Sequence, residues 1–327
     1  MDYFSSDSSP AVAGDDTSVI SKSAVAEKMS VSRQSLYYQP KLPAKDLLLK
    51  QQIEAVLLEH RAYGHRRIAL ALGVNKKRVK RVMKLFNLKA KKLRKKPKIK
   101  NRKSTLKQRQ NLFTGTVINK PDQAWVSDFT YLSYQNKFMY LATILDAFTR
   151  EVISWNISVR HNADLICEAL ISALNKRDKS PQIFHSDQGS EYCSNHVGEI
   201  LRSKNIKASM SAKSSPWQNG KQESFYQKFK FELEELNSYQ SQGELIEAIA
   251  IQIHYYNHRR IHSALKMPPT IFYQRFKAAE NSDAESENNF KKIRAPLHPS
   301  LQRGVQNNQI SPKTNPPIDR SEIQNYE

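Results

Sequence analysis

Short apolar runs separated by turn residues dominate the middle of the chain, between residues 124 and 210. These runs are rich in β-branched and aromatic residues and have the length of strands. The expected strands are 125–134, 137–147, 150–159, 182–185 and 206–210, with helices over 162–175 and 194–204. Three adjacent antiparallel strands followed by alternating helices and strands indicate an α/β fold.

Helical periodicity dominates the region before these strands. Residues 47–60, 64–72 and 76–86 each carry an amphipathic helical pattern, and Asn75 is a good N-cap for the third. The third helix places its apolar residues on one face, so its basic residues are expected to face outward: Lys76, Lys77, Lys80, Arg81 and Lys84. An outward basic face of this kind is typical of a helix that contacts nucleic-acid phosphates.

The two ends of the chain carry weaker patterns. Residues 23–38 have the outline of a partial helix-turn-helix whose second helix is capped at Ser32, although a plain helical hairpin fits the same pattern. Pro40 and Pro43 are expected to punctuate a link into the next helix. The predicted organisation is a disordered N-terminus over 1–20, the partial helix-turn-helix over 21–40, a DNA-binding helical module over 41–92, a basic linker over 93–110, a catalytic core over 111–277 and a disordered tail over 278–327.

The charge of the chain points to a polyanionic partner. Its 52 Lys and Arg against 31 Asp and Glu give a net charge of +21, and 18 of these basic residues lie between Lys76 and Arg109, where no acid occurs. No apolar run has the ~18–20 residues of a spanning helix, so DNA is a better partner than a membrane. Two cysteines, Cys167 and Cys193, predict neither a disulfide framework nor a zinc site. We therefore expect a soluble, cytoplasmic protein.

Three carboxylates sit where different elements could bring them together. Asp128 lies inside the first strand, Asp187 directly follows the strand at 182–185, and Glu223 is in the first turn of a helix. Like charges in a partly dry pocket require a counter-charge, and an all-carboxylate set favours Mg²⁺ or Mn²⁺. Two such ions can support displacement at a phosphodiester. Asp146 is a competing acid, but its place between two strands favours a turn.

Further polar residues around these acids are candidates for contacts with DNA. Gln218, Asn219 and Lys221 belong to a segment, 213–221, that is expected to be a mobile loop. Lys230 comes two turns after Glu223 on the same helix and could pair with a phosphate; helix capping and surface charge are the alternatives. His254, His258 and His262 have helical spacing and could in principle hold a metal, although a structural role is the simpler interpretation.

Several ordered motifs together resemble one family, the insertion-sequence transposases related to retroviral integrases. They are Trp125-x-x-Asp128-x-Thr130, His185-Ser-Asp-x-Gly, Ser209-Met-Ser followed by Gln218-Asn-Gly-x-x-Glu223-Ser-Phe, and Tyr256-Asn-x-x-Arg-x-His262-x-x-Leu265. The resemblance covers roughly residues 45–272, and 35 residues separate Asp187 from Glu223 as in the family's acidic signature. It implies a ribonuclease H-like catalytic core preceded by a helix-turn-helix-like module.

The resemblance also implies an activity. Such enzymes bind the terminal inverted repeats of their own element, cut to expose a 3′-hydroxyl and use it to attack another phosphodiester. The resemblance implies that Asp128, Asp187 and Glu223 hold two Mg²⁺ or Mn²⁺ ions. These enzymes work on paired DNA ends, so a homo-oligomer and a nucleoid location are implied, and the product of an upstream reading frame is a candidate partner. Two alternatives stay open: a DNA-binding protein derived from a transposase, and a ribonuclease H-type nuclease.

Overall fold

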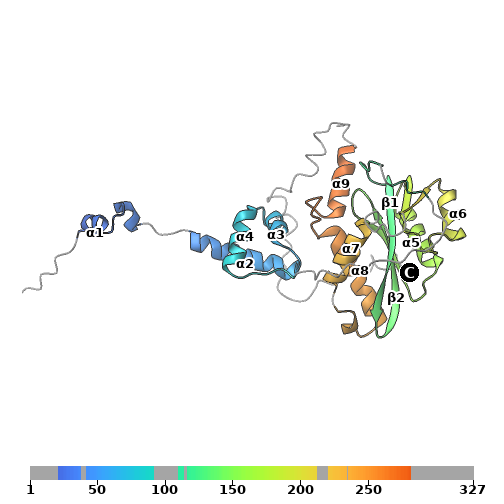
Figure 1. Cartoon of the computed structure of the whole chain (residues 1–327), viewed down its shortest axis with the longest axis horizontal. Helices are drawn as coiled ribbons and strands as arrows, with labels where there is room; N and C mark the ends of the chain where they lie inside the picture. The colour runs from blue at the N-terminus through green and yellow to red at the C-terminus, as the bar shows by residue number, and fades with distance from the viewer. Residues whose placement is uncertain are drawn as a thin grey trace, which may run out of the picture. The chain divides into compact units, whose positions relative to one another are not determined.

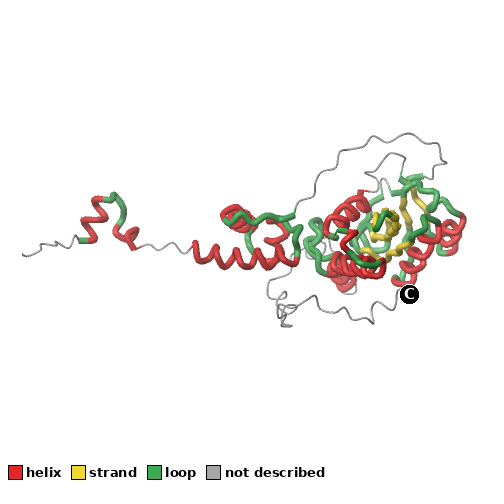
Figure 2. Tube along the Cα trace, turned by 90° about the horizontal axis from the view of Figure 1, so that it is seen from below, coloured by secondary structure: helices red, strands yellow, loops and turns green. Residues whose placement is uncertain are grey.

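The computed structural model of the chain describes residues 21–37, 42–91, 110–113, 116–211, 220–233 and 235–280. These residues separate into two compact units that divide between Leu49 and Lys50, inside helix α2. Figure 2 shows the helices and strands of both units. The predicted disordered N-terminus lies outside the described residues, as do nearly all of the basic linker and of the tail.

The first unit differs from the expected helix-turn-helix in two places. Helix α1 (Lys22–Lys28) is capped by Ser21, whose Oγ accepts the Ala24 N–H at 3.2 Å. The expected second helix is only a 3₁₀ helix, Arg33–Tyr37, because Ser32 accepts the Ser35 N–H in a short i to i+3 turn. Helix α2 (Leu42–Glu59) begins before the predicted residue 47, since Pro43 occupies its first turn, where a missing N–H costs nothing.

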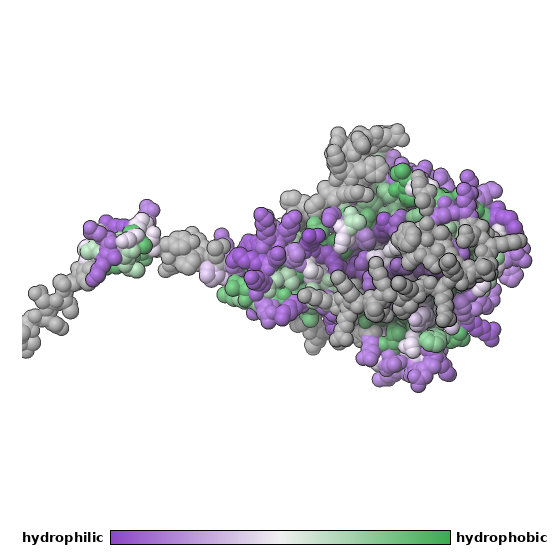
Figure 3. Space-filling view, in the orientation of Figure 1, coloured by the Kyte–Doolittle hydropathy of each residue, from purple (hydrophilic) through white to green (hydrophobic). Residues whose placement is uncertain are grey.

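Two further helices follow the expected pattern. Helix α3 (His65–Leu72) ends at Gly73, whose φ of 64° closes the helix in the left-handed region. Helix α4 (Lys76–Leu85) starts at Asn75, whose side chain accepts the Lys77 N–H at 2.8 Å. Val79 and Val82 are fully buried, whereas the five basic residues named above on this helix are exposed. Figure 3 shows hydrophilic residues gathered over this part of the molecule.

A five-stranded mixed sheet forms the core of the second unit. Its strands are β1 (Ala124–Tyr134), β2 (Lys137–Asp146), β3 (Val152–Ser158), β4 (Ile183–Ser186) and β5 (Lys207–Met210). Their order in the sheet is β3-β2-β1-β4-β5. β1 pairs antiparallel with β2, and β2 with β3, while β4 lies parallel to both β1 and β5. This is the topology of the ribonuclease H-like fold, so the predicted fold class is confirmed.

Helices cover both faces of the sheet, because neighbouring residues of each strand point to opposite sides. Trp125 packs with α5 (Ala163–Lys176) and α6 (Asn195–Ser203), whereas Val126 packs with α7 (Gly220–Glu232) and α8 (Gln242–His258). Figure 1 shows these two pairs of helices on opposite sides of the sheet. A short 3₁₀ helix, Leu236–Ser238, joins α7 to α8.

One further helix, α9 (Pro269–Glu280), was not predicted. Its Phe272 is buried against Phe148 in a small separate apolar cluster with Leu265 and Met267. Because only a few apolar residues define its buried face, the helical period was difficult to see in the sequence. None of the described helices is long and apolar enough to cross a lipid bilayer.

Candidate active site

Two of the three candidate acids lie at the same end of neighbouring parallel strands. Val126 of β1 is paired with His185 of β4, and Asp128 and Asp187 each follow two residues later. Parallel strands keep this register, so both carboxylates emerge together at the carboxyl end of β4. Asp128 is still inside β1, whereas Asp187 follows the last residue of β4. This register brings the two acids close together from separate strands, as expected from the sequence.

Helix α7 brings the third acid, Glu223, to the same end of the sheet. The buried Gln222 donates from Nε2 to the carbonyls of Val126 at 2.7 Å and Thr143 at 3.1 Å. One turn later the hydroxyl of Tyr226 donates to the carbonyl of Asp128 at 2.7 Å and accepts from Thr143 Oγ1 at 2.9 Å. These bonds attach the helix to β1 and β2 and leave Glu223 exposed on its outer side.

Gln222 and Tyr226 were not predicted from the sequence as site residues. The sequence nevertheless contains a pattern that could have indicated them. Both are polar residues spaced i and i+4, close to Glu223, in a helix whose other buried residues include Phe225 and Phe229. A buried polar side chain is stable only when it is hydrogen bonded, so such a pair indicates specific partners. Which carbonyls they bind depends on the tertiary fold.

Burial is the main cause of the raised pKa values of the three acids, and at Asp128 the charges of the other two add to it. Burial, followed by the charge of Asp187 and, more weakly, of Glu223, raises the pKa of Asp128 to about 8, against the opposing Phe129 N–H and Lys230. Burial also raises the pKa of Asp187, opposed by the Gly189 N–H, and a smaller degree of burial raises that of Glu223. Their carboxylates therefore create a site that disfavours negative charge and favours a cation.

The acids are close enough to interact but are not gathered around one point. Among the described residues, no three His, Cys, Asp or Glu side chains are arranged so that they could hold a metal ion together. The donor set itself is that of a hard divalent cation, since it consists of carboxylates without thiol or imidazole. The chemistry of the residues thus fits Mg²⁺ or Mn²⁺.

In the turn after Asp187, a glycine leaves room for two carboxylates. The Gly189 N–H donates to Asp187 Oδ1 at 3.0 Å. A Cβ at this position would lie 2.7 Å from Glu191 Oε2 and 3.2 Å from Asp187 Oδ1, so any other residue would displace one of the two carboxylates. Glu191 is an additional acid that sequence analysis did not identify. It is paired at 3.2 Å with His161, whose ring packs against Phe129.

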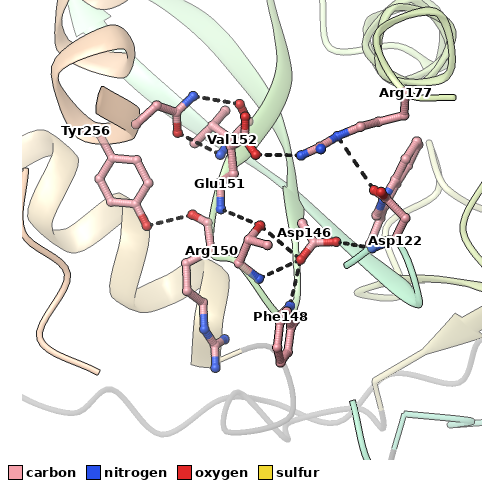
Figure 4. Close-up of polar contacts among 11 residues, drawn as sticks. Asp122, Asp146, Phe148, Arg150, Glu151, Val152, Arg177 and Tyr256 are labelled. Carbon is pink, nitrogen blue, oxygen red and sulfur yellow. Dashed lines mark hydrogen bonds and ion pairs between the residues drawn. The ribbon is translucent and has the colours of Figure 1, made fainter. Parts of the chain in front are cut away.

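Asp146, the competing acid, has a structural role. One of its oxygens accepts the N–H groups of Phe148 and Thr149 at 2.8 and 2.6 Å and the Thr149 hydroxyl, and the other accepts the Asp122 N–H at 2.7 Å (Figure 4). Arg177 closes the same network, with an ion pair of 2.6 Å to Glu151. Asp146 therefore organises the turn between β2 and β3, as its position in the sequence suggested.

The Tyr-Asn-x-x-Arg-x-His motif attaches the end of α8 to this turn and to α7. The Tyr256 hydroxyl donates to the Arg150 carbonyl at 3.0 Å (Figure 4), and the Asn257 side chain bonds both the N–H and the carbonyl of Val152 at 2.9 Å. Arg260 forms a two-pronged ion pair with Glu232, whose shorter contacts are 2.7 Å. The motif is thus largely a scaffold for the turn and for the helix that carries Glu223.

The three histidines of the predicted spacing do not form a cluster. The rings of His254 and His258 stack at 4.1 Å on α8. His262 follows the helix and lines a cavity beside α7. The structural interpretation of these histidines agrees with this arrangement, and the alternative of a shared metal does not.

The candidate DNA-binding residues around the site have different positions. Lys230 donates to the Tyr131 carbonyl at 2.6 Å and lies over the Tyr131 ring, on the side of α7 that carries Glu223. Lys221 is not part of a loop: it lies in the first turn of α7, where its ammonium is 4.5 Å from the centre of the Phe113 ring. Gln218 and Asn219, with most of the predicted loop, lie outside the described residues.

Comparisons with known proteins identify the family to which the chain is similar. Models of the integrase core domain match residues 118–216 and 204–269. The chain is 36% identical over 227 residues to the transposase for insertion sequence element IS904 of Lactococcus lactis, covering 67% of this chain and 90% of that protein. It is 41% identical over 114 residues to the transposase InsF for IS3A of Escherichia coli, covering 34% and 39%. The HTLV-2 integrase catalytic core is 19% identical with a TM-score of 0.40, covering 46% of this chain and 95% of that one.

Proposed function

The chain belongs to the insertion-sequence transposases with an integrase core domain, and from this premise we propose that it binds the terminal inverted repeats of its element and catalyses metal-dependent cleavage and strand transfer of DNA. In this proposal Asp128, Asp187 and Glu223 are the catalytic residues. The observation that carries it is the placement of Asp128 and Asp187 two residues beyond a paired position of parallel strands, with Glu223 attached beside them through α7.

The three acids would hold a divalent cation, Mg²⁺ or Mn²⁺, and a pair of ions is the arrangement expected for in-line phosphodiester displacement. A bound cation would neutralise charge on the attacking and leaving oxygens. The protein's contribution is to hold the carboxylates ready: the Gly189 turn fixes Asp187, and Tyr226 holds the backbone of Asp128. Burial and, second, the charge of Asp187 raise the pKa of Asp128, and this supports the role, since a nearby cation would favour the carboxylate form.

Contacts with DNA are assigned to two surfaces of the described chain. Helix α4 offers Lys76, Lys77, Lys80, Arg81 and Lys84 on its exposed side. Near the acids, Lys230 is on the side of α7 that carries Glu223 and lowers the pKa of Asp128, so it is close enough to act on a phosphate at the site. We assign end recognition to the helical region over 41–92 and the reaction to 111–277, with assembly on paired ends as a homo-oligomer.

The proposal is tested by strand transfer with the purified full-length protein on labelled DNA ends from its own locus, in Mg²⁺ or Mn²⁺. Wild-type protein should cut and join these ends, and Glu223→Gln should retain end binding but lose both reactions by at least a thousandfold. Glu199→Gln, which removes an exposed carboxylate from α6 on the other face of the sheet, is the matched control and should stay active.

Two other outcomes would point elsewhere. Wild-type protein that binds its ends but never cuts them would favour a DNA-binding protein derived from a transposase, unless addition of the upstream reading-frame product restores cutting. Cleavage without preference for the element's ends would favour a ribonuclease H-type nuclease.

A further inference from the structure

A cavity lined by polar residues lies beside α7, on the side of the helix opposite Glu223. It has a volume of about 360 Å³ and opens between α7, the turn that precedes β3 and the segment after α8. This volume is within the ~300–1,000 Å³ typical of small-molecule sites. Its walls include the apolar side chains of Phe113, Phe225 and Tyr256, and its polar groups come from Arg150, Lys221, Ser224, Lys228 and His262.

Positive charge is concentrated in this cavity. Arg150, Lys221 and Lys228 all line it, and none of the described lining residues is acidic. Two acids lie close enough to act on these lysines, but both bind other groups. Asp146 accepts hydrogen bonds within its own turn, and Glu232 forms an ion pair with Arg260. Burial, followed by the charges of Arg260 and Arg67, lowers the pKa of Lys228 to about 8. Collecting such groups is costly to the fold unless an anion compensates them.

Two further features are typical of a site that binds a ligand. His262 Nδ1 is buried and has no hydrogen-bond partner among the described residues. An uncharged imidazole with an unpartnered nitrogen can donate to a ligand oxygen. Arg150 adopts a φ of 66°, in the left-handed region that is unfavourable for residues other than glycine. Its side chain extends away from the Asp146 network (Figure 4), so the turn directs this cation elsewhere.

The cavity is separate from the three acids. Lys221, Ser224 and Lys228 are spaced i, i+3 and i+7 along α7 and share one side of the helix, because seven residues are close to two turns. Glu223 and Lys230 are also seven residues apart, but they are rotated by about half a turn from the first set. An anion in the cavity would thus be separated from the acids by the thickness of the helix, about 10 Å.

From this geometry we propose that the cavity behind α7 binds the phosphate group of a nucleotide, with Lys221, Lys228 and Arg150 around the phosphate and the aromatic walls against its sugar or base. The nucleotide is either free or part of a nucleic-acid strand, since both present the same chemistry. The site is distinct from the one that performs strand transfer and does not depend on that activity.

The test is a titration of the full-length protein, by calorimetry without divalent metal, with three probes: inorganic phosphate, a 5′-mononucleotide and a short 5′-phosphorylated single strand of unrelated sequence. Lys221→Gln and Lys228→Gln should each weaken binding of at least one nucleotide probe about tenfold, whereas Lys228→Arg should restore most of it. The matched control is Lys204→Gln, which removes an exposed charge after α6 and should change nothing.

The probes separate the sources of the phosphate. Binding of the mononucleotide that depends on Lys228 indicates a free nucleotide, and dependence seen only with the oligonucleotide indicates a strand. If Lys221→Gln and Lys228→Gln, shown to be folded by circular dichroism, bind every probe as Lys204→Gln does, the proposal is wrong. Because Glu223→Gln should bind the probes as wild type does, failure of strand transfer and failure of this site are distinguishable.

Discussion

The hydroxyl of Tyr226 on α7 donates a hydrogen bond of 2.7 Å to the main-chain carbonyl of Asp128 on β1. It links the backbone of the first candidate acid to the helix that carries the third, Glu223. Any shift of the helix along the sheet would break this bond and the bonds of Gln222. The relative position of the two acids is thus determined by polar groups buried beneath them.

Substitution of Tyr226 by phenylalanine tests this link. Tyr226→Phe removes the bonds to the carbonyls of Asp128 and Leu141 and to the Thr143 hydroxyl. It should lower the free energy of unfolding by about 1–3 kcal/mol, since buried carbonyls lose a partner. Metal-dependent DNA cleavage should fall by more than tenfold in protein that is still folded. Urea denaturation and cleavage assays measure the two effects. Tyr131→Phe, at a residue that is 60% exposed, is the control. Equal cleavage by both variants would contradict a positioning role for Tyr226.

The acids Asp146 and Asp187 should respond oppositely to amidation. Asp146→Asn replaces one acceptor of a fully satisfied buried carboxylate and should cost about 1–3 kcal/mol of stability while leaving metal affinity unchanged. Asp187→Asn removes a charge that repels Asp128 and should not destabilise the metal-free protein.

Thermal unfolding with and without Mg²⁺ distinguishes these two variants. Wild type and Asp146→Asn should both be stabilised by the ion, by several degrees at saturation, and chelation should reverse the effect. Asp187→Asn should not respond. A normal Mg²⁺ response of Asp187→Asn would remove this residue from the predicted site.

The stability of the second unit should depend on pH through His60. Burial, with the charges of Arg259, Arg260 and Arg67, lowers the pKa of this histidine from 6.5 to about 4. Between these values the unfolded chain binds a proton that the folded chain does not, so stability is complete above about pH 6.5 and falls as the pH drops towards 4. The largest slope from this residue is about 1.4 kcal/mol per pH unit.

Urea denaturation from pH 4 to 7.5 measures this slope. His60→Phe keeps a ring to stack on Tyr63, which is 4.2 Å away in the native pair, and should flatten the profile by up to one proton. The exposed His196→Phe is the control and should keep the wild-type slope. An unchanged slope in His60→Phe would mean that this histidine is not the group that resists protonation.

Helix α4 should contribute to DNA binding through charge alone. Lys77→Gln and Lys80→Gln remove exposed cations without touching Val79 or Val82. Each lost phosphate contact should reduce the slope of log K against log salt by about 0.9. Fluorescence anisotropy across a salt series measures this slope, with Lys204→Gln as control. Identical slopes would show that α4 does not face DNA in the complex.

Much of the architecture was predictable because it depends on local pattern. Along each strand, successive side chains point to opposite faces of the sheet. The limits of β1, β2 and α5 agree with those predicted to within one or two residues. Asn75 was recognisable as a cap because capping needs only a side chain three positions or fewer from its partner. Asp146 was recognisable as a turn residue for the same local reason.

Local patterns in the sequence were sufficient to predict most of the elements, the basic character of the chain and the three candidate acids, since each of these features is visible within a short segment. Three relationships depend on the tertiary fold: the bonds by which Gln222 and Tyr226 attach α7 to the sheet, the room that Gly189 leaves for Glu191, and the cavity that Lys221 and Lys228 share with Arg150 and His262. These relationships join segments up to about a hundred residues apart. They depend on the strand register and the packing of helices on the sheet, which no local pattern specifies.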